Sequence, residues 1–179
     1  MDAREADRLI AAAVPPGPGT WADLGAGDGT FTRALAARLG PGARIYAVDR
    51  DARALKALKR DLAALDADIR TVEADLSHAF ALPGTTPGTL DGLLLANTLH
   101  FLPVTNGALA WLASWLRPGG TAVLIEYDQR TSSRWVPYPV NADKLPSLFA
   151  DAALTPPQIV ARADSAFGGE MYVAVGKRR

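Results

Sequence analysis

A short segment of the chain combines acidic residues with closely spaced glycines: Asp23-Leu24-Gly25-Ala26-Gly27-Asp28-Gly29. Glycine has no Cβ, so the backbone here can turn tightly and approach a ligand closely. The dinucleotide-binding pattern G-x-G-x-x-G requires a glycine at position 30, where this chain has Thr30, and no P-loop lysine follows. Because the first cation after the loop is Arg33, the segment favours a positively charged ligand over a pyrophosphate. An ordinary tight turn between a strand and a helix is the alternative.

Two further acids stand where apolar runs end. Asp49 follows twenty residues after Gly29 and terminates the run 45–48. A carboxylate in this position can accept both hydroxyl hydrogens of a ribose, which implies an unphosphorylated nucleoside. The alternative is that Asp49 caps the following helix, a role that Asp51 could share. Asp75, just past a third apolar run, is placed to accept from an adenine amino group, or else is a solvated loop acid.

Of the two histidines, His100 is the better candidate for proton transfer. The unperturbed pKa of imidazole, about 6.5, suits a general base near neutral pH. His100 also closely follows the most apolar run in the chain, residues 90–96. A packed loop with a hydrogen-bonded imidazole would explain its position equally. His78 lies in a polar loop, and we expect it to be exposed.

Arginine and aromatic side chains gather in the segment that follows the fifth predicted strand: Tyr127, Arg130, Arg134, Trp135 and Tyr138. Guanidinium groups suit a carboxylate or phosphate, and aromatic rings suit a flat molecule. The segment is therefore a candidate lid or substrate rim. The alternative is a solvated loop whose tryptophan packs on the sheet.

The composition excludes several kinds of protein. The chain has 179 residues, enough for one domain, and a net charge of 0, so no basic excess attracts nucleic acid or an acidic membrane surface. Without cysteine there are no disulfides, thiolate nucleophiles or cysteine-ligated metals, and two histidines are too few for a three-histidine site. No apolar run approaches the roughly 18 residues of a membrane span. We expect a metal-free cytoplasmic protein, monomer or homodimer, with a single domain over residues 1–179.

Apolar runs that could form strands alternate with helical periodicities, as in α/β proteins. The predicted strands are residues 20–24, 45–48, 69–73, 90–96, 121–126, 159–163 and 171–175. The last two are separated by residues 164–170, too few for a parallel crossover, so we expect an antiparallel hairpin and a mixed sheet. Helices on both faces then give a three-layer α/β/α sandwich, whose ligand lies beyond the carboxyl ends of the strands.

Helix boundaries follow from capping and turn residues. One helix should carry Leu55, Leu58, Leu62 and Leu65 on its apolar face. Thr105 or Asn106 should cap another, and Asn141 should cap a short helix through Ala153. We expect Pro118-Gly119-Gly120 to turn the chain into the fifth strand.

Taken together, these features resemble the class I S-adenosylmethionine-dependent methyltransferases. The resemblance covers nearly the whole chain: the D-x-G-x-G-x-G loop at 23–29, Asp49, Asp75-Leu76, the strand that ends before Asn97, the turn at 116–120 and the terminal hairpin. It implies a Rossmann-like seven-stranded sheet of order 3-2-1-4-5-7-6 with strand 7 antiparallel, in agreement with the hairpin expected from the short link.

The resemblance also implies that eight residues bind S-adenosylmethionine: Asp23, Gly25 and Gly27 along the methionine moiety, Asp49 at the ribose, Arg50 beside the adenosine, Asp75 and Leu76 at the adenine, and Asn97 at the amino group through its backbone carbonyl. Methyl transfer from a sulfonium is an in-line displacement, so positioning can supply most of the catalysis. A base is needed only if the nucleophile arrives protonated, and His100 is the candidate.

The function expected from the resemblance is methyl transfer to a small-molecule acceptor, producing S-adenosylhomocysteine. The acceptor motif of enzymes that methylate exocyclic amines of nucleic acids is absent, because Asn97-Thr98-Leu99-His100 stands where Asn/Asp-Pro-Pro-aromatic would be. Two alternatives stay open. One is a non-catalytic protein that binds the cofactor as a sensor or partner subunit, and the other is a nicotinamide-dependent oxidoreductase, which the glycine spacing disfavours.

Overall fold

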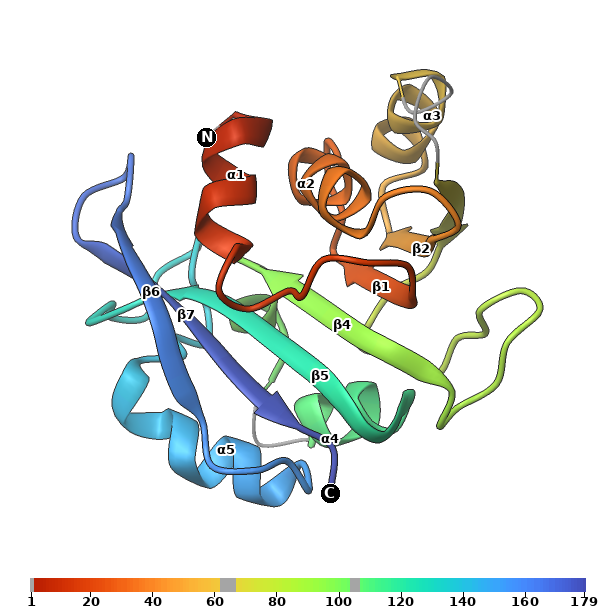
Figure 1. Ribbon diagram of the computed structural model, residues 1–179. Coiled ribbons are helices and arrows are strands. Elements are labelled where there is room, and N and C mark those ends of the chain that lie inside the picture. Colours follow the sequence, from red (N-terminus) through yellow and green to blue (C-terminus); the bar gives the residue numbers. More distant parts are fainter. Residues whose placement is uncertain (1, 62–66, 104–106) are drawn as a thin grey trace.

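The computed structural model describes residues 2–61, 67–103 and 107–179, and its centre is a seven-stranded sheet of order β3-β2-β1-β4-β5-β7-β6 (Figure 1). The strands are β1 (Thr20–Leu24), β2 (Arg44–Asp49), β3 (Asp68–Glu73), β4 (Leu90–Ala96), β5 (Leu116–Tyr127), β6 (Gln158–Asp164) and β7 (Glu170–Lys177). β7 runs antiparallel to both β5 and β6, whereas the other strand pairs in the described part of the chain are parallel. The predicted strand order and the antiparallel last strand are confirmed.

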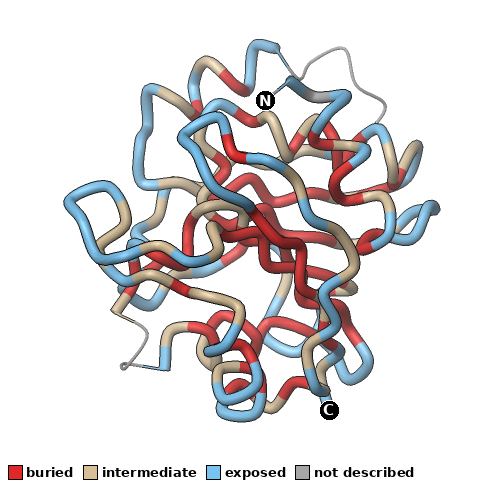
Figure 2. The backbone as a smooth tube through the Cα atoms, turned by 90° about the vertical axis from the view of Figure 1, so that its left-hand side faces the viewer, coloured by how far each residue is buried: buried red, intermediate tan, exposed pale blue. Residues whose placement is uncertain are grey.

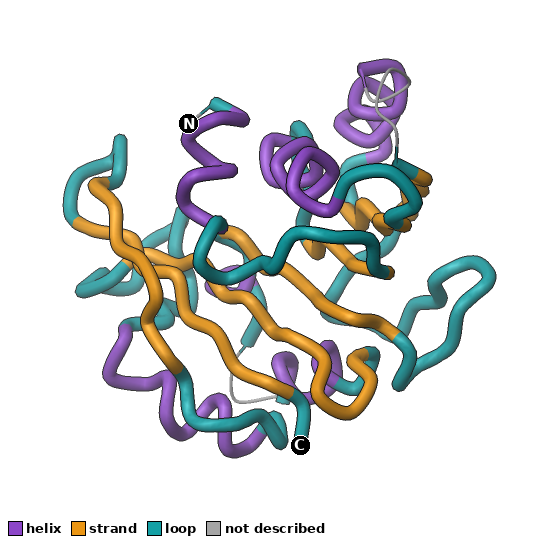
Figure 3. Tube along the Cα trace, viewed as in Figure 1, coloured by secondary structure: helices purple, strands orange, loops and turns teal. Residues whose placement is uncertain are grey.

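Helices cover both faces of the sheet (Figure 3). One face carries α1 (Ala3–Ile10), α2 (Thr30–Leu39) and α3 (Ala52–Asp61), and the other carries α4 (Ala108–Ala113) and α5 (Leu145–Asp151). Two single-turn 3₁₀ helices, η1 (Leu99–Phe101) and η3 (Ala142–Lys144), follow β4 and precede α5. The three-layer α/β/α arrangement is therefore as the sequence predicts. None of the described helices is long and apolar enough to cross a membrane.

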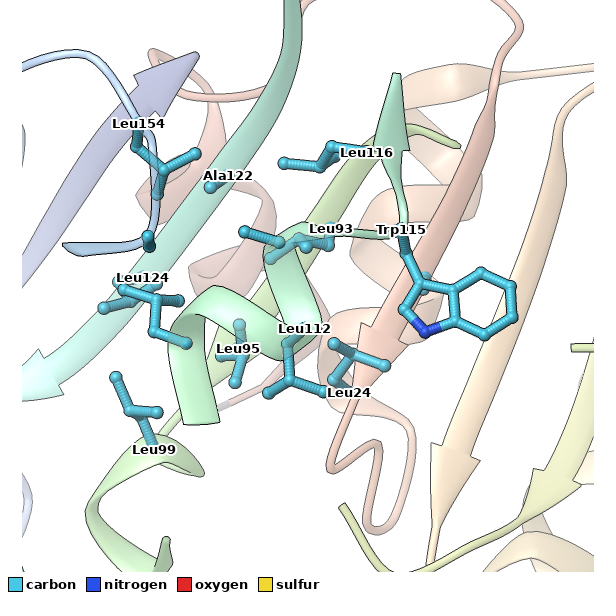
Figure 4. Close-up of a cluster of buried hydrophobic side chains, with 14 of the residues drawn as sticks. Leu24, Leu93, Leu95, Leu99, Leu112, Trp115, Leu116, Ala122, Leu124 and Leu154 are labelled. Carbon is cyan, nitrogen blue, oxygen red and sulfur yellow. The ribbon is translucent and has the colours of Figure 1, made fainter. Parts of the chain in front are cut away.

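The sheet separates two apolar cores. Leu93, Leu95 and Leu124 pack with Leu112 of α4 in one of them (Figure 4), while Val123 and its neighbours on the opposite face pack under α1 and α2. Strands β4 and β5 are thus buried on both faces, which explains their continuous apolar sequences. Figure 2 shows the buried residues running through the sheet and the exposed ones gathered in the loops around it.

Strand β5 begins earlier than expected, because the predicted turn at 118–120 belongs to the strand itself. Leu116 pairs with Leu90 and Thr121 pairs with Gly92, so the extra residues of β5 form an irregular bulge. The end of the chain stabilises this bulge: Gly119 N donates to Arg178 O at 2.8 Å, and Arg178 N donates to Gly120 O at 2.8 Å. The long-range pairing replaces the local turn that Pro and Gly predict.

Asn141 stands at the expected N-cap position, directly before η3, but the predicted side-chain cap is wrong. Its side chain makes no capping bond, and instead accepts from Arg130 N at 2.9 Å and donates to Arg130 O at 3.2 Å. The first turn of the helix is the 3₁₀ helix η3, which continues directly into α5, and α5 ends at Asp151, two residues before the expected Ala153. Four of the residues expected to build or cap helices, Leu62, Leu65, Thr105 and Asn106, lie outside the described residues.

Candidate active site

The glycine loop after β1 folds back over the end of β2. Gly25 N and Ala26 N both donate to Val48 O, at 2.8 and 2.9 Å. Gly27 N donates to Asp49 Oδ2 at 2.8 Å. The φ angles of Gly25, Gly27 and Gly29 are 85°, 53° and 80°, a left-handed region that other residues rarely adopt. The loop therefore needs its glycines for backbone conformation.

The three glycines differ in what surrounds them. A Cβ on Gly25 would lie 2.2 Å from Thr98 Oγ1, and a Cβ on Gly29 would lie 1.9 Å from Leu58 Cδ1. A Cβ on Gly27 would meet no atom within 4 Å. Gly25 thus lets the loop pack against Thr98, which precedes η1, and Gly29 lets it pack against α3, whereas Gly27 borders open space.

Asp49 connects the loop to the start of α3 without capping that helix. Its Oδ1 accepts from Asp51 N at 2.9 Å, while Asp51 Oδ1 accepts from Arg53 N and Ala54 N at 2.8 and 3.2 Å. Asp51 is therefore the cap. Asp49 is half-buried, and each of its two oxygens accepts one hydrogen bond. An ionised carboxylate has about four acceptor sites, so two stay available to a ligand.

Asp23 lies beneath the loop, fully enclosed at 1% exposure. Burial raises its pKa to about 7, reinforced by the charges of Asp49 and Asp28 and opposed by a 2.6 Å hydrogen bond from Thr32 Oγ1. The side chain of Asp23 does not line the cavity described below. The Asp23 side chain accepts its hydrogen bond from Thr32 of α2. Asp23 therefore supports the glycine loop from the side of the protein core.

The residues predicted at the adenine lie together at the ends of β2 and β3. Asp75 accepts from Ser77 N and Ser77 Oγ at 2.9 and 2.6 Å, and these bonds, with the nearby charge of Arg50, lower the pKa of Asp75. Leu76 is 7% exposed and packs in the core. Asp49, Arg50, Asp75 and Leu76 are all absent from the cavity wall. His78, as expected, is exposed.

A cavity of about 810 Å³ opens on the other side of the glycine loop. Its walls come from the loop itself, α1, the ends of β4 and β5, and the β6–β7 hairpin. Figure 1 shows α1 between α2 and this hairpin, and contacts of α1 with both α2 and β6 agree with that placement. Of the predicted cofactor residues, the cavity brings together Gly25, Gly27 and Asn97.

Asn97, which lines this cavity, has a buried acceptor that is not used. Its backbone has a φ of 52°, and its Nδ2 lies 3.9 Å from Met171 Sδ. Oδ1 is buried and accepts no hydrogen bond from the described residues. A buried polar atom without a partner is costly, so this oxygen is suited to a donor on a bound ligand.

His100 forms a buried pair with Glu126, the last inward-facing acid of β5. His100 Nδ1 lies 2.6 Å from Glu126 Oε2, and His100 N donates to Glu126 Oε1 at 3.2 Å. The two residues are only 2% and 1% exposed. His100 does not line the cavity, but Tyr127 does, and the centroids of the His100 and Tyr127 rings are 5.7 Å apart. The His100–Glu126 pair therefore lies outside the cavity wall, next to the wall residue Tyr127.

Sequence reasoning missed Glu126, although a signal was present. An acid at the end of an otherwise apolar strand must be paired if it is buried. The cavity residues Glu5, Arg8, Leu9 and Phe31, and those of the β6–β7 hairpin, carried no comparable signal. Their role follows only from how α1 and the hairpin pack around the loop.

Only part of the predicted substrate rim lies at the cavity. Tyr127 lines the cavity, while Arg130 stacks over its ring at 5.2 Å and donates to Phe167 O at 2.9 Å and to Gly168 O. Arg134 stacks over Trp135 at 4.7 Å, and Trp135 is 69% exposed, so it does not pack on the sheet. These two residues and the half-exposed Tyr138 are absent from the cavity wall.

Comparisons with known proteins agree on one family. A model described as "Methyltransferase domain" matches residues 22–122. The biotin biosynthesis bifunctional protein BioCD of Bordetella avium (strain 197N) is 31% identical over 130 residues, which are 73% of this chain and 26% of that protein. The uncharacterized methyltransferase Rv0089 of Mycobacterium tuberculosis (strain ATCC 25618 / H37Rv) is 33% identical over 121 residues, 68% of this chain and 57% of that protein. The chain thus spans about a quarter and just over half of these relatives.

Solved structures share the fold along nearly the whole chain. Among them is the 1,6-didemethyltoxoflavin-N1-methyltransferase of Burkholderia thailandensis, with bound 1,6-didemethyltoxoflavin and S-adenosylhomocysteine. The TM-score is 0.76 at 22% sequence identity, over 98% of this chain and 77% of that one. At this identity the likeness establishes the architecture alone.

Proposed function

This chain belongs to the methyltransferase domain family, and from that premise we propose that it transfers a methyl group to a small-molecule acceptor beside the glycine loop. It is a class I S-adenosylmethionine-dependent methyltransferase, and S-adenosylmethionine is its cofactor. The family match decides against the nicotinamide-dependent alternative. The observation that carries the proposed site is the hydrogen bond from Gly27 N to Asp49 Oδ2, which joins the loop to the acid at the end of β2.

The residues around the loop fit this cofactor. Gly27 borders open space that a Cβ would enter, and Asn97 Oδ1 is a buried acceptor that an ammonium group would satisfy. Asp28 and Asp49 add negative charge, which suits a ligand with a cationic sulfur and amino group. When bound, S-adenosylmethionine supplies an electrophilic methyl group on a positively charged sulfur.

We assign the cofactor contacts by place in the fold. Gly25, Gly27 and Asn97 would hold the methionine end at the cavity. Asp49 would hold the ribose through its two unused acceptor sites. Arg50, Asp75 and Leu76 lie beyond Asp49 at the ends of β2 and β3, where the adenine would rest. Asp23, which is enclosed below the loop, would position the loop and not touch the ligand.

A small acceptor agrees with the size and surroundings of the cavity. Its volume of about 810 Å³ lies in the usual range for small-molecule sites. The similar B. thailandensis enzyme carries a small heterocycle with its cofactor product. A nucleic-acid acceptor has no support, since the chain has a net charge of 0. Cytoplasmic location and a monomeric or homodimeric state stay predictions.

We propose that His100 accepts a proton from the acceptor and that Glu126 makes this possible. The carboxylate next to Nδ1 holds the tautomer with hydrogen on Nδ1, so Nε2 is left as the proton acceptor. The same carboxylate stabilises the imidazolium that forms. Because Tyr127 stands between the pair and the cavity, the proton would reach His100 through one water molecule beside that ring.

The direct test is calorimetry followed by turnover. S-adenosylmethionine and S-adenosylhomocysteine should each bind at one site, and NAD should not bind. Formation of S-adenosylhomocysteine should then depend on an acceptor from a panel of small molecules with ionisable O–H, N–H or C–H groups. Binding without turnover across the panel would favour the alternative of a non-catalytic cofactor-binding protein, and absence of binding would contradict the proposed site.

A further inference from the structure

Four apolar side chains of the cavity wall are not among the proposed cofactor contacts. They come from different elements: Leu9 of α1, Phe31 of α2, Met171 of β7 and Phe167 of the β6–β7 hairpin. Phe167 is 79% exposed, more than any other large hydrophobic side chain among the described residues. Exposed aromatic surface at the mouth of a cavity gains free energy when a ligand covers it.

The backbone around Phe167 is held in place. Ser165 N donates to Gly169 O at 2.8 Å, and Phe167 N donates to Ser165 Oγ at 3.1 Å. Arg130 donates to the carbonyls of Phe167 and Gly168, and its guanidinium is itself held over the Tyr127 ring. These bonds hold the backbone of the hairpin tip that carries the Phe167 ring. Less conformational entropy is therefore lost when a ligand binds against this ring.

The charges around the cavity restrict the ligand further. Three carboxylates line it, from Glu5, Asp28 and Asp164. Of the two guanidinium groups in the wall, that of Arg162 is already paired with Asp128 at 3.0 Å and with Glu170. Only Arg8 is left to oppose the carboxylates among the described lining residues. The surroundings therefore disfavour a ligand with negative charge.

We propose that Phe167 determines acceptor specificity, and that the cavity takes planar apolar molecules that carry no negative charge. This inference rests on the proposed function, since it names the class of acceptor for the same site. Phe167 covers one face of the ring, and Leu9, Phe31 and Met171 supply apolar contacts from the other elements. The ionisable group of the acceptor then lies toward Tyr127 and the buried His100–Glu126 pair.

The test uses the full chain saturated with S-adenosylhomocysteine and two fluorescent probes, 2-naphthol and naphthalene-2-sulfonate. Wild-type protein should bind 2-naphthol saturably, and should bind the sulfonate about tenfold more weakly because of the carboxylates. Phe167→Ser should weaken 2-naphthol binding about tenfold, and Phe167→Tyr should restore it. Trp135→Ser is the matched control, since Trp135 is also exposed but lies outside the cavity wall, and it should leave binding unchanged.

The outcomes separate this inference from the proposed function. If S-adenosylhomocysteine does not bind the wild-type chain in calorimetry, the proposed function itself fails. If it binds, the inference is overturned by absence of saturable 2-naphthol binding, by equal affinity in Phe167→Ser, or by a sulfonate that binds as tightly as the phenol. Equal losses in Phe167→Ser and Trp135→Ser would also overturn it, because the effect would then not be specific to the cavity.

Discussion

Asp49 Oδ2 accepts a hydrogen bond from Gly27 N at 2.8 Å, so the acid that ends β2 holds the ligand loop that follows β1. The two residues are 22 positions apart in the sequence; Asp49 ends β2, and Gly27 lies in the loop that follows the adjacent parallel strand β1. This bond ties the proposed ribose contact to the shape of the loop. A change at Asp49 should therefore affect the cofactor in two ways, by loss of a ligand contact and by loss of loop geometry.

Replacement of Asp49 should weaken S-adenosylmethionine binding. For Asp49→Ala we expect a loss of roughly 1.5–3 kcal/mol, the scale of a charge-assisted hydrogen bond. Asp49→Asn keeps an oxygen that can accept from Gly27 N, so it should preserve the loop and lose less. Calorimetric titration of the two folded variants measures both effects. An unchanged affinity in Asp49→Ala would remove the ribose assignment.

The glycines of the loop should separate into two classes. Gly29→Ala should destabilise the fold by about 2–4 kcal/mol, because its new methyl group would overlap Leu58 and the backbone would be strained. Gly27→Ala should cost only about 1–2 kcal/mol of backbone strain, yet should weaken cofactor binding, since the space around it is open.

Urea unfolding and calorimetry of the glycine variants give the two readouts. The Leu58→Ala change should be less harmful in the Gly29→Ala background than in the wild type, because it removes the overlapping atoms. Additive effects of these two changes would contradict the packing role of Gly29. A Gly27→Ala variant with wild-type cofactor affinity would show that the ligand does not approach the loop there.

The buried pair should control turnover and not cofactor binding. Glu126→Gln removes the charge that stabilises an imidazolium, and its single amide oxygen cannot accept from both His100 N and His100 Nδ1, so kcat should fall about 100-fold. His100→Asn and His100→Ala should also slow turnover, with the affinity for S-adenosylhomocysteine nearly unaltered. The asparagine variant still offers a donor to Glu126, which avoids an unpaired buried carboxylate. Turnover at the wild-type rate in a folded variant would reduce His100 to a packing residue.

Asp23 should make the protein less stable at neutral pH and above than in acidic solution. Burial raises its pKa to about 7 in the folded state, against an ordinary value near 3.9 in the unfolded chain. Between these values the folded state binds the extra proton, so this contribution is complete below about pH 4 and is lost as the pH rises through about 7. The loss amounts to at most about 4 kcal/mol.

Asp23→Asn should remove this dependence, because an amide does not ionise and can still accept from Thr32 Oγ1. Urea unfolding at pH 5 and pH 8 compares the two proteins. Wild-type protein should lose more stability than the variant over this interval. Parallel behaviour of wild type and variant would mean that Asp23 ionises normally in the folded protein.

The sequence was sufficient for the elements that depend on local pattern. Apolar runs identify the strands, and the short link 164–170 identifies the antiparallel hairpin, because chain length alone forbids a parallel crossover there. Asp49 could be placed for the same reason, since it ends a strand. The bulge in β5 was not predictable, because its partner is Arg178 at the far end of the chain.

The hydrogen-bond partners of long polar side chains were the least predictable feature. Arg130 has the chemistry to bind an anionic ligand, yet it is used to brace the hairpin, because the Phe167 and Gly168 carbonyls lie within its reach. Asn141 has the chemistry of a helix cap, yet it bonds to the backbone of Arg130. In both cases the side chain bonds to a residue distant in the sequence and does not take the role that its own segment predicts.

A crystal structure of the chain with S-adenosylhomocysteine tests the central claim most directly. The ribose hydroxyls should lie on the Asp49 carboxylate, the purine beside Asp75 and Leu76, and the sulfur at the cavity next to Gly27 and Asn97. A nucleoside bound elsewhere, with Asp49 in contact only with Gly27 and Asp51, would contradict it.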